Sequence, residues 1–145
     1  MEKDTLVYID TNIFAEAALE QSSRGEAART IIGALTIGRI KAATSAITWN
    51  EFVGLIYREL GVHEAARAAK AFPSHQNINI IPVDRSVLTE AASSIENYKL
   101  LPQDAIHHAT MKLRGITYLI SEDKDFDITN IKRHTATEFA KILGI

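Results

Sequence analysis

The sequence contains no cysteine, which excludes disulfide bonds and thiolate chemistry. It also has no apolar run of the length that a membrane-spanning helix needs, and no signal-peptide pattern at its N-terminus. We therefore expect a cytoplasmic protein that does not enter the membrane. No internal repeat and no linker rich in Pro, Gly or Ser interrupts the chain. Residues 1–145 are accordingly expected to form one domain with a sizeable core.

The chain also lacks a large excess of charge of either sign, because it contains 16 Lys and Arg residues and 18 Asp and Glu residues. The formal net charge of -2 gives nucleic acid no global attraction to the chain. A polyanion would need a local basic patch or bound metal ions. Residues that either flank such a groove or simply keep the protein soluble are Lys41, Arg58, Lys112, Arg114 and Lys124.

The apolar run Leu6–Ile9 is rich in β-branched and aromatic residues, which predicts a buried strand. Asp10 follows it directly, and Thr11 and Asn12 are residues that favour the start of a helix. This order places the Asp10 carboxylate at the C-terminal end of a central strand. In open α/β sheets ligands bind at that edge, beside the amide dipoles of the next helix.

Segments with apolar residues at helical spacing alternate with short apolar runs along the rest of the chain. The spacing predicts helices over residues 28–35, 49–60, 62–72, 88–95, 102–114 and 137–143. Further strands are predicted at residues 40–44, 77–83 and 116–121, with a short one near Ile131. This alternation indicates an α/β domain with three layers, α/β/α, in which helices cover both faces of a central, mostly parallel sheet.

Four acidic residues are distinguished by where they fall in this pattern. Asp10 and Asp123 each follow a predicted core strand, so adjacent strands would bring their carboxylates to one edge of the sheet. Glu51 lies one turn into a long helix, and Asp104 lies in the first turn of the helix that begins at Pro102. Our hypothesis is that the two helix positions complete a cluster at the same edge.

Such a cluster of carboxylates requires compensation. Two like charges about 4 Å apart repel by roughly 4 kcal/mol at an effective dielectric constant of about 20. The carboxylates must therefore bind a cation or take up protons. Hard oxygen ligands without cysteine favour Mg²⁺ or Mn²⁺. An ion held in this way can bridge a phosphodiester and activate water, which predicts metal-dependent hydrolysis of a phosphate ester.

Each acid also has a purely structural interpretation. Asp10 can cap a helix, and Asp104 can complement the helix dipole in a first turn. Helical periodicity places Glu51 opposite the apolar stripe formed by Trp49, Phe52, Val53, Ile56 and Leu60, which is typical of a solvated side chain. These alternatives stay open at the level of sequence.

The remaining polar residues near the acids have similar alternatives. Asp123, Asp125 and Asp127 can belong to a solvated loop that follows Ser121, the last polar residue of its strand. Neighbouring helical positions point about 100° apart, so His107 and His108 cannot both share a site with Asp104. We interpret the two histidines as structural or surface residues.

Two other protein classes also begin with a strand that ends in aspartate. A haloacid-dehalogenase-like phosphatase needs a second Asp two residues after the first, and here that position is Asn12. A receiver domain needs adjacent acids after its first strand and an acceptor Asp after a mid-chain strand, whereas Glu51 lies on a predicted helix. Both classes are disfavoured.

Four segments together resemble the PIN-domain ribonucleases, and most closely their VapC-type toxin branch. They are YIDTN (8–12), SAITWNEF (45–52), LPQDAI (101–106) with Ala109 and Thr110, and LISEDKDF (119–126). They occur in the order found in that family and span most of the chain. Each alone is a weak signal, and the combination is fairly specific.

The resemblance implies a PIN-like fold and a divalent-metal-dependent endoribonuclease that hydrolyses RNA phosphodiester bonds with Mg²⁺ or Mn²⁺. It assigns metal binding and catalysis to Asp10, Glu51, Asp104 and Asp123, and a further metal-binding acid to Asp125. It assigns supporting roles to Thr11, Asn12 and Ser121. It also implies a VapB-like antitoxin as partner and a homodimer formed through helices.

Two positions depart from the pattern of the family. Glu122 occupies a position that is often basic or neutral in relatives, so it adds negative charge where RNA should approach. Ala136 stands where many relatives have proline before the last helix. A free-standing PIN nuclease in RNA processing and a catalytically idle PIN-like binding module are the alternatives to a toxin.

Overall fold

The centre of the fold is a five-stranded sheet, seen in a computed structural model that describes residues 4–145. The strands are β1 (Leu6–Ile9), β2 (Lys41–Ser45), β3 (Ile78–Ile81), β4 (Tyr118–Ile120) and β5 (Lys132–His134). They lie in the order β3-β2-β1-β4-β5, and every neighbouring pair is parallel. The prediction of a mostly parallel sheet is confirmed, and β1 is its middle strand.

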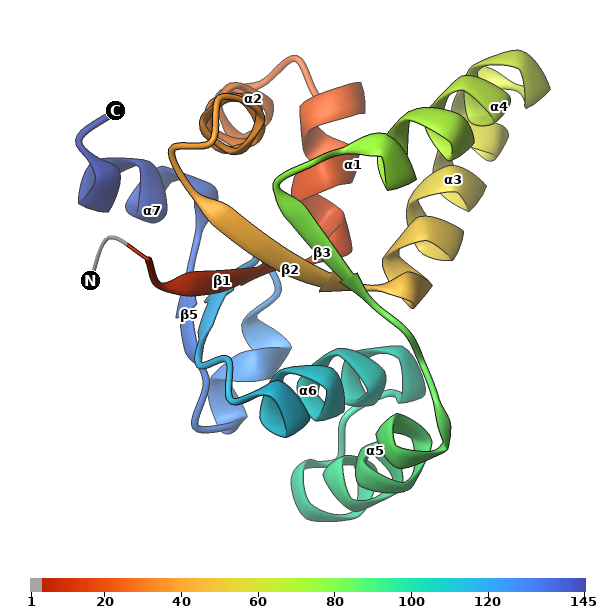
Figure 1. The fold of residues 1–145 in the computed structure, drawn as a ribbon, viewed down its shortest axis with the longest axis vertical. Coiled ribbons are helices and arrows are strands. Elements are labelled where there is room, and N and C mark those ends of the chain that lie inside the picture. The colour runs from red at the N-terminus through yellow and green to blue at the C-terminus, as the bar shows by residue number, and fades with distance from the viewer. Residues whose placement is uncertain (1–3) are drawn as a thin grey trace.

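Helices cover both faces of this sheet, as Figure 1 shows. They are α1 (Thr11–Leu19), α2 (Ser23–Thr36), α3 (Ala46–Leu60), α4 (Val62–Ala71), α5 (Arg85–Tyr98), α6 (Pro102–Arg114) and α7 (Ala136–Leu143), with 3₁₀ turns η1 (Phe72–Ser74) and η2 (Lys124–Ile128). The helices α5 and α6 lie on one side, and the other five lie on the opposite side (Figure 1). The three-layer α/β/α prediction is therefore confirmed. Within residues 4–145, none of the helices combines the length and the apolar character that crossing a bilayer requires.

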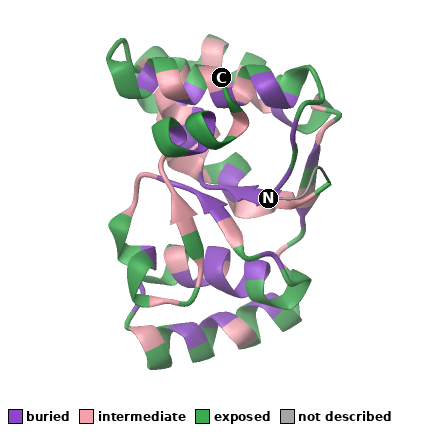
Figure 2. Cartoon of the chain, turned by 90° about the vertical axis from the view of Figure 1, so that its left-hand side faces the viewer, coloured by how far each residue is buried: buried purple, intermediate pink, exposed green. Residues whose placement is uncertain are grey.

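The alternation of side chains along β1 divides the core between the two helical layers. Val7 and Ile9 belong to the cluster formed with α1, α2 and α7, whereas Tyr8 belongs to the cluster that contains Met111 and Phe126. All three β1 side chains are almost completely buried, because each face of the sheet is covered. Figure 2 shows the buried strands between helices whose outer faces are exposed.

The register of β1 and β4 determines which residues meet beyond the sheet. Ile9 pairs with Ile120, and the backbone N–H of Asp10 donates to the carbonyl of Ile120 at 3.1 Å. Asp10 and Ser121 are thus the first residues after two adjacent parallel strands. The C-terminal edge of the sheet carries both, as the sequence predicted.

The apolar stripe predicted on α3 is not buried at either of its ends. Trp49 is 39% exposed and Leu60 is 53% exposed, although Ile56 in the middle of the stripe is buried. Trp49 is held at the surface because its indole N–H donates to the carbonyl of Ala69 in α4 at 3.1 Å. The helix instead buries Thr48 completely, which turns the polar face of α3 toward the edge of the sheet.

Candidate metal centre

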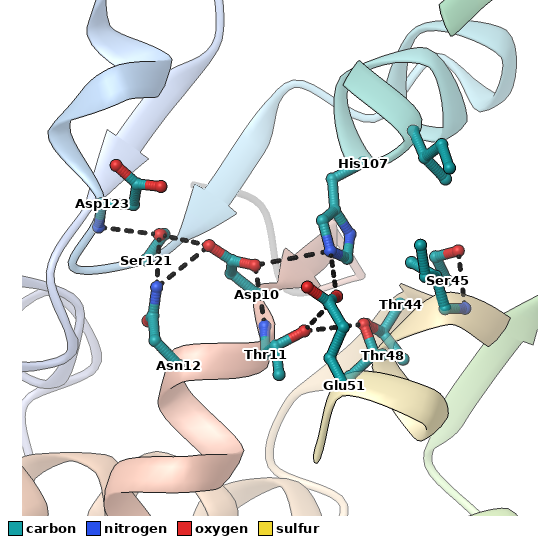
Figure 3. A network of polar contacts seen from close by, with 12 residues as sticks. Asp10, Thr11, Asn12, Thr44, Ser45, Thr48, Glu51, His107, Ser121 and Asp123 are labelled. Atoms are coloured by element: carbon teal, nitrogen blue, oxygen red, sulfur yellow. Dashed lines mark hydrogen bonds and ion pairs between the residues drawn. The ribbon is translucent and has the colours of Figure 1, made fainter. Parts of the chain in front are cut away.

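Asp10 is buried at the edge of the sheet and held by three hydrogen-bond donors (Figure 3). Its Oδ1 accepts from the backbone N–H of Thr11 at 2.8 Å. Its Oδ2 accepts from the amide of Asn12 at 3.0 Å and from the hydroxyl of Ser121 at 2.7 Å. Asp10 therefore caps α1 and also belongs to the polar cluster, so the two interpretations of this residue do not exclude each other.

Asn12 and Ser121 connect the start of α1 to the loop after β4. The amide of Asn12 donates to Ser121 Oγ at 3.1 Å, and its Oδ1 accepts from the backbone N–H of Glu122 at 3.2 Å. The hydroxyl oxygen of Ser121 also accepts from the backbone N–H of Asp123 at 3.0 Å. These bonds fix the position of Asp123 relative to Asp10, as Figure 3 shows.

Glu51 reaches the same cluster from α3. Its Oε1 accepts from the hydroxyl of Thr11 at 2.9 Å and from Nε2 of His107 at 2.9 Å. The side chain is only 19% exposed, so the solvated alternative for Glu51 is wrong. Periodicity misses this burial because the neighbour on the same face is Thr48, whose hydroxyl bonds to that of Thr44 at 2.8 Å.

His107 is the residue of this cluster that the sequence did not assign to a site. It is 1% exposed, its Nδ1 lies 2.6 Å from the Tyr8 hydroxyl, and its Nε2 lies 3.7 Å from Asp10 Oδ1. His108 points elsewhere and bonds to the Ser94 hydroxyl at 2.7 Å. Only His107 shares the site, as expected for neighbouring helical positions that point about 100° apart. Both histidines are buried, so neither is a surface residue. The sequence feature that could have indicated this role is the spacing from Asp104. His107 follows Asp104 by three residues, which places both on the same face of the helix.

Three further carboxylates form an acidic triad, which we define as Asp104, Asp123 and Asp125. Each offers one oxygen, and these oxygens lie within 4.8 Å of one another. Asp104 and Asp123 are partly buried, whereas Asp125 is exposed. The triad offers only hard oxygen ligands, which fits Mg²⁺ or Mn²⁺. The structure thus places a set of cation ligands beside Asp10 and Glu51.

The charges of the site shift the pKa values of its members. Burial, together with the carboxylates of Asp123 and Asp10, raises the pKa of Asp104 to about 6. Burial alone would also raise the pKa of Glu51, but the hydrogen bond and charge of His107 outweigh it and lower the pKa of Glu51. Burial opposes the charged form of His107, yet Glu51 and Asp10 raise its pKa above the usual value. Without a metal ion, the repulsion therefore favours the protonated forms of Asp104 and His107 more than in the isolated groups.

The sequence matches the family model for the PIN domain over residues 7–132, a range that contains all of the acids described above. The chain belongs to the PIN-domain family. PIN domains are typically metal-dependent nucleases, and the acidic triad of this PIN domain offers ligands for such a metal. A search among curated proteins found no match.

Solved structures with the same fold include toxins of toxin–antitoxin systems. The Mycobacterium tuberculosis toxin VapC20, which cleaves the sarcin-ricin loop, matches with a TM-score of 0.72 and 20% identity, covering 87% of this chain and 98% of the toxin. A toxin–antitoxin complex from Klebsiella pneumoniae matches with a TM-score of 0.65 and 24% identity, over 90% of this chain and 97% of the matched chain. FitAcB from Neisseria gonorrhoeae matches with a TM-score of 0.67 and 19% identity, over 90% of this chain and 98% of the matched chain. At these identities the likeness shows that the PIN domain shares their fold.

Proposed function

We propose that this PIN domain is a divalent-metal-dependent endoribonuclease, and specifically a toxin of the VapC type. The observation that carries the proposal is the acidic triad at the C-terminal edge of the sheet, where hydrogen bonds through Ser121 join Asp123 to Asp10. Repulsion among these carboxylates favours a bound cation. A cation bound there would let a chain without global positive charge hold the phosphodiester of an RNA strand.

In this proposal the residues divide into ligands and supports. Asp10, Glu51, Asp104, Asp123 and Asp125 would hold Mg²⁺ or Mn²⁺, which would supply positive charge for the scissile phosphate and lower the pKa of a water molecule. Glu51 remains a carboxylate at neutral pH because its pKa is lowered, so it can serve as an oxygen ligand.

The supporting residues keep these carboxylates in place. Thr11 and His107 hold Glu51, and Asn12 and Ser121 hold Asp10. Such fixed hydrogen bonds preserve the geometry that hydrolysis of a phosphodiester demands.

The proposed partners are a VapB-like antitoxin and a second copy of the chain. Similar folds in a toxin–antitoxin complex and in VapBC complexes from other organisms support the antitoxin. Exposed apolar side chains on α3 and α4 support a homodimer formed through helices; they include Tyr57 at 57%, Leu60 at 53% and Val62 at 64% exposure. We further propose that residues 1–145 act as one domain.

The test is incubation of the purified protein with transfer and ribosomal RNA, in Mn²⁺ or in chelator. We expect cleavage in Mn²⁺, none in chelator, and none with Asp104→Asn. Glu26→Gln is the matched control, because Glu26 is an exposed acid on α2, in the opposite helical layer from α6. Cleavage that persists in chelator would refute the metal mechanism.

Titration calorimetry with Mn²⁺ separates the enzyme from an idle binding module. The enzyme should bind Mn²⁺, and the binding should weaken in Asp104→Asn, whereas a docking module should bind no metal. A neighbouring short reading frame that encodes a DNA-binding antitoxin would favour the toxin over a free-standing RNA-processing nuclease.

A further inference from the structure

A cavity of about 420 Å³ opens directly beside the acidic triad. Asp104 and Asp125 of the triad form part of its wall, so the cavity and the candidate metal centre are continuous. The remaining wall comes from the end of α5, the connection from α5 to α6, and η2. A volume of this size lies within the range of small-ligand pockets, which begins at about 300 Å³.

The rest of the wall combines positively charged residues with exposed apolar groups. Lys99 and Lys124 line it, and the ammonium of Lys99 donates to the backbone carbonyl of Glu96 at 2.9 Å on the exposed end of α5. Leu101 and Ile128 are 67% and 63% exposed, and Tyr98 lines the same cavity. An ammonium group binds a phosphate, and apolar or aromatic groups pack against the face of a base. The chemistry of this wall is therefore that of a nucleotide.

The backbone of Lys99 adds an independent observation. Lys99 ends α5 in the left-handed conformation, with φ 59° and ψ 30°. Among residues 4–145 it is the only residue other than glycine with positive φ. Glycine adopts this conformation without strain, so a lysine here holds its side chain at the cavity at a cost in stability.

We propose that this cavity is a nucleotide subsite, which holds the nucleotide next to the scissile phosphate of an RNA strand. Lys99 and Lys124 bind the phosphate of that nucleotide, and Leu101, Ile128 and Tyr98 pack against its base. The inference rests on the proposed nuclease function. It adds the position at which the RNA strand leaves the metal centre. Contacts of this kind accept any base, because stacking and charge do not distinguish the hydrogen-bonding edges.

The lysines are tested by the binding of a fluorescein-labelled single-stranded RNA oligonucleotide, followed by anisotropy at several salt concentrations with Ca²⁺ in place of Mg²⁺. We expect Lys99→Gly and Lys124→Gln each to weaken binding about fivefold to tenfold. Each should also reduce the slope of log K against log salt by about 0.7, the value for one lost phosphate contact on a single strand. Lys41→Gln is the control, since Lys41 is an exposed lysine at the opposite end of β2 from the site.

Loss of folding does not explain a loss of binding in these variants. Lys99→Gly relieves the left-handed backbone, so its thermal stability should equal or exceed that of the wild type. Leu101→Ser places a favoured capping residue at the start of α6, where no side-chain cap bond is present. Leu101→Ser should weaken binding of the base-containing oligonucleotide severalfold and leave binding of an abasic oligonucleotide of equal length unchanged.

The outcomes separate this inference from the proposed function. If the wild type cleaves RNA in Mn²⁺ but all three variants bind the oligonucleotide like Lys41→Gln, the subsite is refuted and the nuclease stands. If the wild type binds the oligonucleotide and the variants lose affinity as expected, the subsite holds even when no cleavage is found. A wild type that neither binds nor cleaves RNA refutes both.

Discussion

The carboxylate of Glu122 accepts a hydrogen bond from the backbone N–H of Ala136 at 3.1 Å, so the loop after β4 closes the first turn of α7. The resemblance described above singled out these two positions as departures from the PIN pattern. A proline at position 136 would have no N–H to satisfy, and here Glu122 satisfies the N–H that alanine exposes. Arg24 Nε also lies 4.0 Å from Glu122. The Glu122 carboxylate, which was expected to oppose the approach of RNA, therefore also stabilises the fold.

The pair of Glu122 and Ala136 predicts a coupled effect on stability. Glu122→Ala should lower the free energy of unfolding by about 1 kcal/mol, because it leaves a helix-terminal N–H without its partner. In an Ala136→Pro background the same substitution should cost almost nothing, since the donor is gone. Urea unfolding of the four proteins in this cycle measures the coupling. Equal costs in the two backgrounds would show that Glu122 acts elsewhere.

The contact between Glu51 and His107 predicts a loss of stability that depends on pH. The pKa of His107 is raised in the fold, so its contribution is present below the unfolded value of about 6.5 and is lost as pH rises through the folded value. His107→Leu should therefore destabilise the metal-free protein by about 2 kcal/mol at pH 6 and by less at pH 9. His107→Gln keeps an N–H donor and should cost less. Chemical denaturation at the two pH values is the measurement, and a pH-independent cost would argue against the charged pair.

The raised pKa of Asp104 predicts the same pH trend in the metal-free protein, but here removal of the charge stabilises the fold. A folded pKa of about 6 means that Asp104 favours folding at low pH and opposes it as pH rises through 6. Asp104→Asn should therefore stabilise the apo protein at pH 8 by about 1 kcal/mol, or about 3 °C in Tm, once solvent screening of this half-buried group is allowed for. At pH 4 the gain should vanish. Calorimetric scans in chelator at both pH values test it, and a gain that persists at pH 4 would contradict it.

Removing the charge of Asp10 and removing that of Asp125 should have different effects on the stability of the protein. The oxygens of Asp10 accept from three donors, and an amide in their place has a single acceptor oxygen, so Asp10→Asn should destabilise even the apo protein by about 2 kcal/mol. Asp125 is exposed, so Asp125→Asn should leave the apo protein almost unchanged and reduce only the rise in Tm that Mn²⁺ produces. Melting curves with and without Mn²⁺ distinguish these effects. An apo protein equally weakened by both substitutions would refute this division.

The elements with clear boundary signals were predictable from sequence. The helix α6 begins at Pro102 and ends before Gly115, as predicted, because proline suits the first helical position and Gly115 adopts a φ of +65°. The place of Asp10 and Asp123 followed from the rule for the ends of parallel strands. These features depend on residues close together in the chain or on a general rule of topology.

The role of His107 was not predictable in the same way. Its hydrogen-bond partners Tyr8 and Glu51 lie 99 and 56 residues away, and the spacing from Asp104 indicates a shared helical face but neither of these contacts. The exposure of Trp49 likewise depends on where α4 packs, so periodicity within α3 alone placed it in the core. Sequence reasoning reached the set of carboxylates but missed the imidazole that partly balances their charge.

The bond between Ser121 and Asp10 joins residues that are 111 positions apart. During synthesis, a nascent chain with β1 already outside the ribosome still lacks β4 and the acids that follow it. A truncated chain that ends before residue 121 has the same deficiency. The candidate metal centre can therefore be assembled only after the segment that follows β4 has been made, and a half-made chain lacks it.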